Sequence, residues 1–458
     1  MLIAFRVRNF RSIRDEQELT LTRSGRMKAA AGDGPGPWDE RVTSVAGFYG
    51  SNASGKSNLL LAMRAAKRAI VDSHAGWNPE RDIPYTPYKF DASREEPTWY
   101  EFEFRVDGLR LQYGFEHDRR RFLREWLYAY PKGRRQTWYE RDASGDEEWY
   151  FGKLLGGQNR VIAETTRPNA LFLSAAASAH HPRLRAVYRW FSYHLIFAME
   201  SDRNSRLRYT LNLIESEPSM VAAVTSLLKH ADLGICDVRV RHREMTDDER
   251  AKVTRVARAM FNELGPSDGA SGGPDSDETA WAQALEAAST YVELAHACAD
   301  GDPVSLPFEA ESVGTQSLVA LAGPVLEALR DGDTLVIDEI DTSLHPRLVA
   351  EVVKLFRSPA TNPRQSQLLF TTHDTSLLGG LLGDGPILER DQIWFVEKNG
   401  KGATSLYPLT DFSPRRMENL ERGYLQGRYG AVPYIEALNA QLRSSDADVE
   451  HRAMSGSA

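Results

Sequence analysis

Hydrophobic and polar residues alternate along several short segments of the first 150 residues, a pattern typical of β-strands with one buried face. Leu2 to Val7 and Glu18 to Thr22 alternate in this way, and three longer segments follow, TWYEFEFRV, LRLQYGFEH and FLREWLYAY. Asp-Gly and His-Asp dipeptides separate these three, and such turn-forming pairs join antiparallel strands. The pattern predicts an antiparallel β lobe between about Tyr85 and Tyr150.

Apolar residues at helical spacing dominate the middle of the chain, from Pro182 to His230 and again from Asp247 to Leu264. One such face consists of Leu184, Val187, Trp190, Phe191 and Leu195. No heptad pattern persists for three or four repeats, so we expect a compact helical insertion and not a coiled-coil arm. The low-complexity stretch GPSDGASGGPDSDE follows and predicts a mobile loop.

Helix-like and strand-like segments alternate after Ser305, as they do where parallel strands are buried on both faces. Residues 315–330 and 346–357 have the pattern of helices, and TLVIDE, QLLFTTH and IWFVEK have that of buried strands. Near the start of the chain, the apolar segment Val45 to Tyr49 precedes a glycine-containing loop and the helical stretch SNLLLAMRAAKRAIVDS. The predicted fold class is therefore α/β, with a mixed central sheet, the antiparallel β lobe and an inserted helical subdomain.

Composition limits the kind of protein this chain can be. With 458 residues, 41% of them hydrophobic, it is long enough for two or three domains. It has no stretch of about eighteen apolar residues and its N-terminus is charged, so we expect no membrane association and a cytoplasmic location. Only Cys236 and Cys298 are present, which argues against a disulfide scaffold or a cysteine-rich zinc site.

The formal net charge of −8 argues against a protein that coats nucleic acid indiscriminately, because such proteins bind phosphates through many lysines and arginines. Two local clusters of basic residues remain: Arg119, Arg120, Arg121 and Arg124, continuing to Lys132, Arg134 and Arg135, and the group Arg239, Arg241 and Arg243. Acidic residues stand near both clusters, so we interpret them as solvated strand edges and leave contact with nucleic acid open.

Residues 50–57, GSNASGKS, fit the P-loop pattern and stand between a predicted strand and a predicted helix, as that motif requires. Glycines let the backbone approach phosphate groups, to which amides at the helix N-terminus then donate. Lys56 places a positive charge against the β- and γ-phosphates, and Ser57 offers a hydroxyl to Mg²⁺. The motif predicts ATP and Mg²⁺ as cofactors, with nucleotide contacts from Gly50, Ser51, Asn52, Ala53, Ser54, Gly55, Lys56, Ser57 and Asn58.

The segment TLVIDEIDTSLHP supplies two neighbouring acids at the end of an apolar strand. Asp338 can reach the ligand shell of Mg²⁺, and Glu339 is placed to polarise a water beside the γ-phosphate. We therefore predict Glu339, with Lys56, as catalytic, and Asp338, with Ser57, as metal-binding. For Glu339 the alternative is a structural carboxylate bonded to a loop.

Two further segments resemble the ABC-type ATPase core in their order and spacing. ESVGTQSLVALAGPVLEAL places Ser312 and Gly314 just before a helix, and QLLFTTHD ends a strand at His373. The resemblance implies that Ser312 and Gly314 are a signature sequence that serves the opposite subunit's site. It also implies that His373 is a catalytic switch histidine and that Asp341 touches the partner. A helix N-terminus with a hydroxyl and free amides suits a γ-phosphate.

Both ends of the chain extend the resemblance. FRVRNFRSIRD, followed by YGSNASGKSNLL, resembles the SMC-like and OLD-like ATPase heads, in which an arginine at the position of Arg11 lies close to bound nucleotide. LERDQIWFVEK, LYPLTDF and GYLQGRYGAVP resemble the AbiL/RloA-like ATPases of bacterial abortive-infection and phage-defence cassettes. That family implies a homodimer or higher oligomer that controls a separately encoded, RloB-like effector nuclease, and it admits a phage protein as the trigger.

On this basis we divide the chain into four parts. Residues 1–175 and 301–443 are expected to form the two halves of an ATPase head, residues 176–300 the helical insertion, and residues 444–458 a disordered tail. Three other functions stay open: a DNA-repair or SMC-like head, an OLD-like nuclease subunit, and an ATP-stabilised scaffold for an effector. No residue is assigned to a Q-loop or to stacking on adenine.

Overall fold

The computed structural model describes residues 1–23, 42–231, 234–242, 244–264, 290–298, 301–382, 385–415 and 418–433. The expected mobile loop after Leu264 and the expected disordered tail at 444–458 lie outside these residues.

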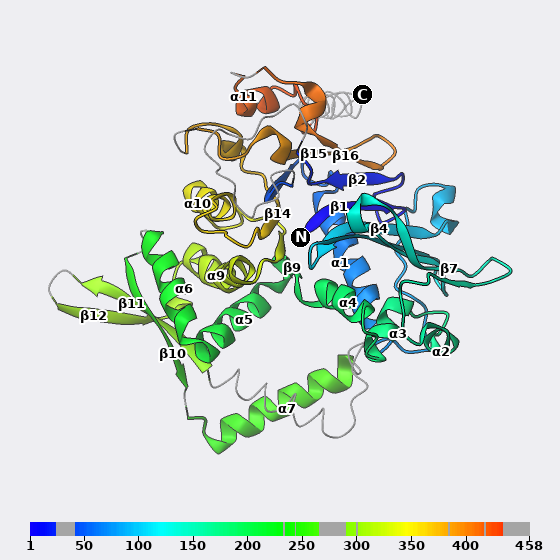
Figure 1. Cartoon of the computed structure of the whole chain (residues 1–458). Coiled ribbons are helices and arrows are strands. Elements are labelled where there is room, and N and C mark those ends of the chain that lie inside the picture. The colour runs from blue at the N-terminus through cyan, green and yellow to red at the C-terminus, as the bar shows by residue number, and fades with distance from the viewer. Residues whose placement is uncertain are drawn as a thin grey trace, which may run out of the picture.

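A six-stranded sheet crosses the centre of the molecule (Figure 1). Five neighbouring strands run parallel, and the sixth pairs antiparallel at one edge. In spatial order the strands are β16 (Thr404–Pro408), β15 (Ile393–Lys398), β3 (Val45–Tyr49), β14 (Gln367–Thr371), β13 (Thr334–Ile337) and β9 (Leu195–Ala198). The predicted α/β class with a mixed central sheet is confirmed.

Side chains of the central strands alternate between two hydrophobic cores, one on each face of the sheet. In β3, for example, Phe48 enters the first core and Tyr49 the second. The first core is shared with α1 (Lys56–Asp72), α2 (Asn159–Thr165), α3 (Phe172–Ser178) and α4 (Leu184–Tyr193). The second is shared with α5 (Arg203–Ser216), α6 (Pro218–His230), α9 (Val313–Asp331), α10 (Pro346–Arg357) and α11 (Leu420–Leu425). Burial on both faces explains why these strands are almost wholly apolar.

The β lobe is a seven-stranded antiparallel sheet that also packs on the first core. Its strands, in spatial order, are β2 (Gln17–Thr20), β1 (Leu2–Arg8), β4 (Thr98–Val106), β5 (Leu109–His117), β6 (Phe122–Ala129), β7 (Gln136–Asp142) and β8 (Trp149–Phe151). Cross-strand ion pairs cover its other face, such as Arg6–Glu101 at 2.7 Å and Arg8–Glu116 at 3.2 Å. These pairs neutralise much of the charge that the arginines bring to the lobe.

The two arginine clusters lie at strand ends and on strands. Residues 119–121 are exposed in the turn between β5 and β6. In β10 (Ile235–His242), Arg239 pairs with Asp237 at 2.9 Å, and Arg241 lies 3.6 Å from Glu293. Arg243 lies outside the described residues. The second cluster is therefore balanced by neighbouring acids where the structure describes it.

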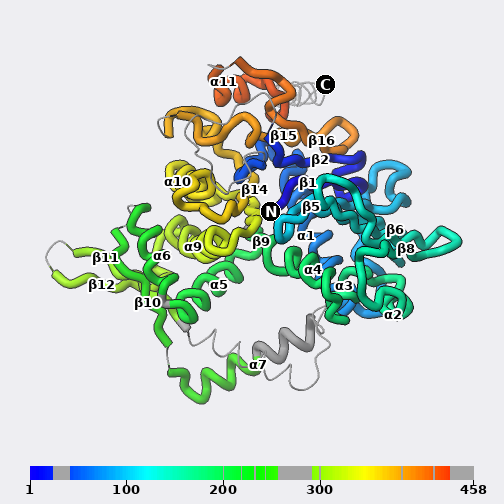
Figure 2. Tube along the Cα trace, in the orientation of Figure 1, coloured from blue at the N-terminus to red at the C-terminus, as the bar shows by residue number. Residues whose placement is uncertain are grey.

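The insertion expected to be helical between residues 176 and 300 contains strands as well. Besides α5, α6 and α7 (Asp247–Leu264), a three-stranded antiparallel sheet stands away from the central sheet (Figure 2), built from β10, β11 (Thr290–Cys298) and β12 (Gly301–Pro307). Leu195, which the helical spacing placed on a helix, instead begins β9 and pairs beside Thr334. That prediction was wrong because LIFA is a four-residue apolar run, and long-range pairing decides where such a run belongs. The division into domains stays a prediction.

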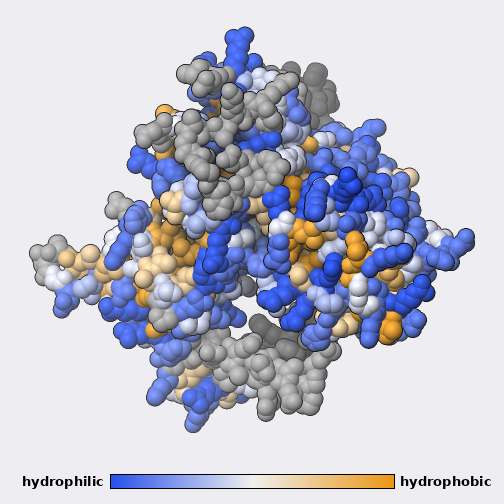
Figure 3. Space-filling model, in the orientation of Figure 1, coloured by the Kyte–Doolittle hydropathy of each residue, from blue (hydrophilic) through white to orange (hydrophobic). Residues whose placement is uncertain are grey.

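Apolar side chains gather on the visible surface over α6, α9 and α10 (Figure 3). A groove of about 780 Å³ lies there, and Leu227, Leu326 and Leu348 are among its lining residues. The second core is therefore only partly covered by the described part of the chain.

Candidate active site

The loop between β3 and α1 forms one wall of a cavity of about 840 Å³. Tight packing explains two of its glycines. A Cβ on Gly50 would lie 2.3 Å from the carbonyl oxygen of Val396, and one on Gly55 would lie 2.3 Å from Thr404 Oγ1. Gly55 also has φ of +109°, a left-handed conformation that side chains disfavour. Only glycine lets this loop pass so close to β15 and β16.

Segments far apart in the sequence meet at this cavity. Its lining residues are Asn52, Ala53, Ser54, Gly55, Lys56, Ser57, Asn58, Glu339, His373 and Lys398. All but Lys398 were singled out from the sequence. Gly50 and Ser51 do not line the cavity, but their carbonyls lie directly against the lysine of the loop.

Lys56 is held in the loop by its own backbone. Its Nζ donates to the carbonyl of Gly50 at 2.8 Å and to that of Ser51 at 3.2 Å, and the residue is buried. Burial lowers the pKa of the ammonium group, while the carboxylates of Glu339 and Asp338 oppose that shift. The fixed ammonium is thus oriented in advance for an anionic ligand in the cavity.

Asp338 and Ser57 come together although they are 281 positions apart in the sequence. Ser57 Oγ donates to Asp338 Oδ1 at 3.1 Å, and Thr371 Oγ1 donates to the same oxygen at 2.7 Å. A hydroxyl and a carboxylate are hard oxygen ligands, and Mg²⁺ in ATPases takes one or two such groups together with waters and phosphate oxygens. The pair therefore fits Mg²⁺, and Ser57 opens directly onto the cavity.

Glu339 turns the chain sharply after β13. Its φ of +53° is left-handed, which is rare for a residue with a long side chain. The backbone N–H donates to Thr371 Oγ1 at 2.7 Å, and Thr342 Oγ1 lies 3.3 Å from one carboxylate oxygen. Residues held in such conformations are concentrated at active sites. Here the turn places the carboxylate of Glu339 at the cavity.

His373 lines the same cavity, two residues after the end of β14. Its backbone N–H donates to Asp341 Oδ2 at 3.2 Å. Asp341 is not among the cavity's lining residues. Within one chain it therefore braces the histidine segment, and contact with a partner subunit stays a prediction.

The expected signature residues form the tip of α9. Ser312 caps this helix, because its Oγ accepts from the N–H of Thr315 at 3.1 Å. A Cβ on Gly314 would lie 2.8 Å from the carbonyl of Ser343, so a glycine is needed there too. Val313, between the two, is 54% exposed. None of the three lines the cavity of its own chain.

Arg11 is exposed and does not line the cavity, so its predicted contact with nucleotide stays a prediction. The next residue, Ser12, is the one tied to the P-loop. Ser12 Oγ accepts from Asn58 Nδ2 at 2.7 Å and lies 2.8 Å from Thr404 Oγ1. Thr404 Oγ1 also lies 2.8 Å from the carbonyl of Ser54. Ser12, Thr404 and Lys398 were not predicted from the sequence, although Ser12 and Lys398 lie in segments that carried the resemblance.

Residues 45–379 match the model of a protein family described as an AAA domain, putative AbiEii toxin, type IV toxin–antitoxin system. The chain belongs to this family. The match covers more than half of this AAA-family chain and includes the P-loop, both acids and His373, so the chain is a P-loop ATPase of the AAA and ABC type. No curated protein sequence matches it.

Several solved SMC head domains are distantly similar to this AAA-family chain. A head bound to the C-terminal winged-helix domain of ScpA has 13% identity and a TM-score of 0.40, covering 89% of this chain and 96% of that chain. The head domain from Thermotoga maritima has 11% identity and a TM-score of 0.38, with 89% and 98% covered. One from Pyrococcus furiosus has 10% identity and a TM-score of 0.33, with 90% and 97% covered. These likenesses are too distant to define a ligand or a partner.

Among the described helices, none has the length and apolarity needed to cross a membrane.

Proposed function

We propose that this AAA-family chain binds ATP with Mg²⁺ at the cavity and hydrolyses it to ADP and phosphate. One observation carries the proposal: Lys56, Ser57 and Glu339 line a single cavity, and Asp338 is bonded to Ser57 beside it. A phosphate loop, a metal-binding oxygen pair and a carboxylate are the parts that hydrolysis of a nucleoside triphosphate needs.

Each of these residues has a separate task. Lys56 and the amides of the loop bind the β- and γ-phosphates. Ser57 and Asp338 would hold Mg²⁺, which neutralises charge on those phosphates when it is bound. Glu339 accepts a hydrogen bond from the attacking water and so orients it towards the γ-phosphate. His373, which lines the same cavity as Glu339, donates to the γ-phosphate.

The proposed active form is a dimer in which each signature tip completes the other subunit's site. Two features support it: Val313 is 54% exposed at the tip of α9, and the tip contributes nothing to the cavity of its own chain. The N-terminal amides of α9 would then receive the γ-phosphate of the partner's nucleotide. ATP binding closes the dimer, and hydrolysis opens it.

We further propose a role in bacterial defence against phage, as a sensor or regulator that controls a separately encoded effector nuclease. Support comes from the resemblance at both ends of the chain to AbiL/RloA-like ATPases and from the family's description as a putative toxin of a toxin–antitoxin system. In the cytoplasm, a phage protein would act by shifting this dimer between its ATP-bound closed form and its open form.

Two substitutions test the ATPase directly. Lys56→Ala removes the positive charge from the phosphate site, so we expect ATP affinity to fall at least about tenfold in calorimetry with Mg²⁺. Glu339→Gln keeps the shape but not the carboxylate, so binding should be retained while phosphate release falls about a hundredfold. Glu309→Gln, an exposed acid outside the cavity, is the control. A wild-type rate for Glu339→Gln would show that another group activates the water.

The same Lys56→Ala variant tests the role in defence. Cells that carry the chain with its neighbouring genes should survive phage challenge, and cells with the variant should not. Equal survival of both strains would refute the defence proposal while leaving the ATPase intact.

A further inference from the structure

Lys398 is the one charged residue of the cavity that the roles above do not use. It is the last residue of β15 and comes from neither the P-loop nor the segments of Glu339 and His373. It is exposed, and no ion pair or hydrogen bond joins its side chain to any residue that the structure describes.

The register of β15 explains why this lysine reaches the phosphate loop. β15 pairs in parallel with β3, so both strands leave the central sheet at the same edge, and the P-loop begins where β3 ends. Side chains on a strand alternate between its two faces, so Trp394, Val396 and Lys398 share one face. Trp394 and Val396 are buried in the core beneath α1. Lys398 is the last residue of this row, at the end of β15, and lines the cavity beside the loop.

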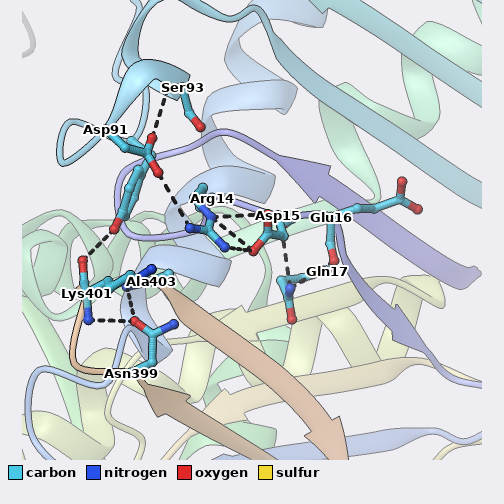
Figure 4. Close-up of polar contacts among 10 residues, drawn as sticks. Arg14, Asp15, Glu16, Gln17, Asp91, Ser93, Asn399, Lys401 and Ala403 are labelled. Atoms are coloured by element: carbon cyan, nitrogen blue, oxygen red, sulfur yellow. Dashed lines mark hydrogen bonds and ion pairs between the residues drawn. The ribbon is translucent and has the colours of Figure 1, made fainter.

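Contacts on both sides fix the backbone around Lys398. Its partner across the hairpin is Thr404, whose N–H donates to the carbonyl of Ser12 at 2.7 Å and whose Oγ1 donates to that of Ser54 at 2.8 Å. On the far side, Asn399 Oδ1 accepts from the N–H groups of Lys401 at 2.9 Å and Ala403 at 3.0 Å (Figure 4). The hairpin is thus bonded to the P-loop segment and closed at its tip, which fixes the backbone position from which the side chain of Lys398 extends.

The acid next to it does not neutralise this lysine. Glu397 points to the other face of β15, where Tyr407 Oη donates to its carboxylate at 3.0 Å. A second ammonium group therefore stands at a cavity that already holds Lys56. A polyphosphate carries enough negative charge to interact with both ammonium groups.

We propose that Lys398 binds the phosphate chain of the nucleotide, as a second lysine supplied by the same subunit. This inference rests on the proposed function, because it assigns a further contact to the same ligand. An ammonium on a flexible stem with three donors suits phosphate oxygens whose positions are set by other groups, here by the P-loop. The contact adds most to nucleotides that carry the most phosphate charge.

The test compares Lys398→Ala with Lys401→Ala. Both remove one lysine from the same hairpin, but only Lys398 lines the cavity. We expect Lys398→Ala to weaken binding of ATP with Mg²⁺ about tenfold in calorimetry and to change the affinity for AMP little, since one charge-assisted contact is lost. Lys398→Arg should recover most of the affinity, and Lys401→Ala should behave as the wild type.

Two results would overturn the inference. Wild-type affinity for ATP in Lys398→Ala would show that the lysine makes no contact. An equal loss for ATP and AMP, or a lowered melting temperature without nucleotide, would show that the substitution acts through the hairpin. If the wild-type chain itself fails to bind ATP, the proposed function fails instead, so the two failures are distinguishable.

Discussion

At the C-terminal end of β5, the imidazole of His117 is enclosed by the rings of Tyr100, Phe115 and Phe122. Its Nδ1 lies 2.8 Å from the carbonyl oxygen of Asp118, so the neutral ring donates there. Burial lowers the pKa of His117 from its usual 6.5 to about 4, although the bond to Asp118 opposes the shift. The β lobe therefore contains a histidine that stays neutral while the protein is folded.

This histidine should make the fold sensitive to acid. Between pH 6.5 and about 4 the unfolded chain binds a proton at His117 that the folded chain does not, so the free energy of unfolding falls as pH is lowered through that window. The loss attributable to His117 reaches about 3 kcal/mol. In His117→Asn, which keeps a donor for the carbonyl, that part of the slope should vanish when urea unfolding is measured from pH 7 to 4. An unchanged slope would mean that other groups cause it.

Some residues of the site could be predicted from the sequence and others could not. Lys56 and Ser57, and likewise Asp338 and Glu339, belong to short motifs whose local chemistry is recognisable. Ser12 and Thr404 contribute through one hydroxyl each, and Lys398 through the register of one strand against another. No local pattern encodes such pairings, because they depend on segments about 350 to 390 residues apart in the sequence.

Among the elements, α9 contains a proline and a glycine in its interior, Pro324 and Gly323. Proline has no N–H, so the carbonyl of Ala320, four positions earlier, lacks its helical partner. Thr210 of α5 compensates: its Oγ1 lies 3.2 Å from that carbonyl and 3.2 Å from the N–H of Gly323. A Cβ on Gly323 would lie 2.5 Å from Thr210 Oγ1. The glycine is what lets the two helices approach.

Gly323→Ala should therefore destabilise the protein, although alanine favours helices over glycine by about 1 kcal/mol. The new methyl group must push α5 away, which costs about 1–3 kcal/mol and lowers the melting temperature by several degrees. Gly400→Ala is the matched control, because a Cβ there meets nothing within 4 Å. Equal melting temperatures for the two variants would show that α5 can move aside freely.

Long periodic elements were predictable and short ones were not. α9 and α10 show their helical pattern over twelve or more residues, and buried strands such as β14 stand between turn signals. β9 has only four residues and lies at the edge of the sheet, held by pairing with β13. Its place in the sheet depends on pairing with a strand 139 positions later, where Leu195 lies opposite Thr334. The spacing of residues within a short segment cannot encode such a pairing.

At the scale of the whole molecule, the P-loop lines the cavity of its own chain and the tip of α9 does not. Gly314 of the tip lies against the carbonyl of Ser343, and neither Ser312 nor Gly314 is among the residues that line the cavity. A composite site in a dimer would use both, and a site confined to one chain would leave the tip without a role in catalysis. The two arrangements predict different results when damaged chains are mixed.

Val313→Asp damages only the tip in such an experiment. Val313 is the first residue of α9 and is exposed, and an acid at that position suits the positive end of the helix, so the monomer should stay folded. The same charge would repel a γ-phosphate held by the other subunit.

In an equal mixture of Val313→Asp with Lys56→Ala, which lacks only the phosphate site, half of the dimers would contain one intact composite site. Phosphate release should recover to about a quarter of the wild-type rate, because an equal mixture then has one site in four intact. A mixture of Lys56→Ala with Glu339→Gln, whose defects both lie in the P-loop half, should show no recovery. If Val313→Asp alone releases phosphate at the wild-type rate, and the first mixture at about half of that rate, each chain must complete its own site, and the dimer cannot be the catalytic unit.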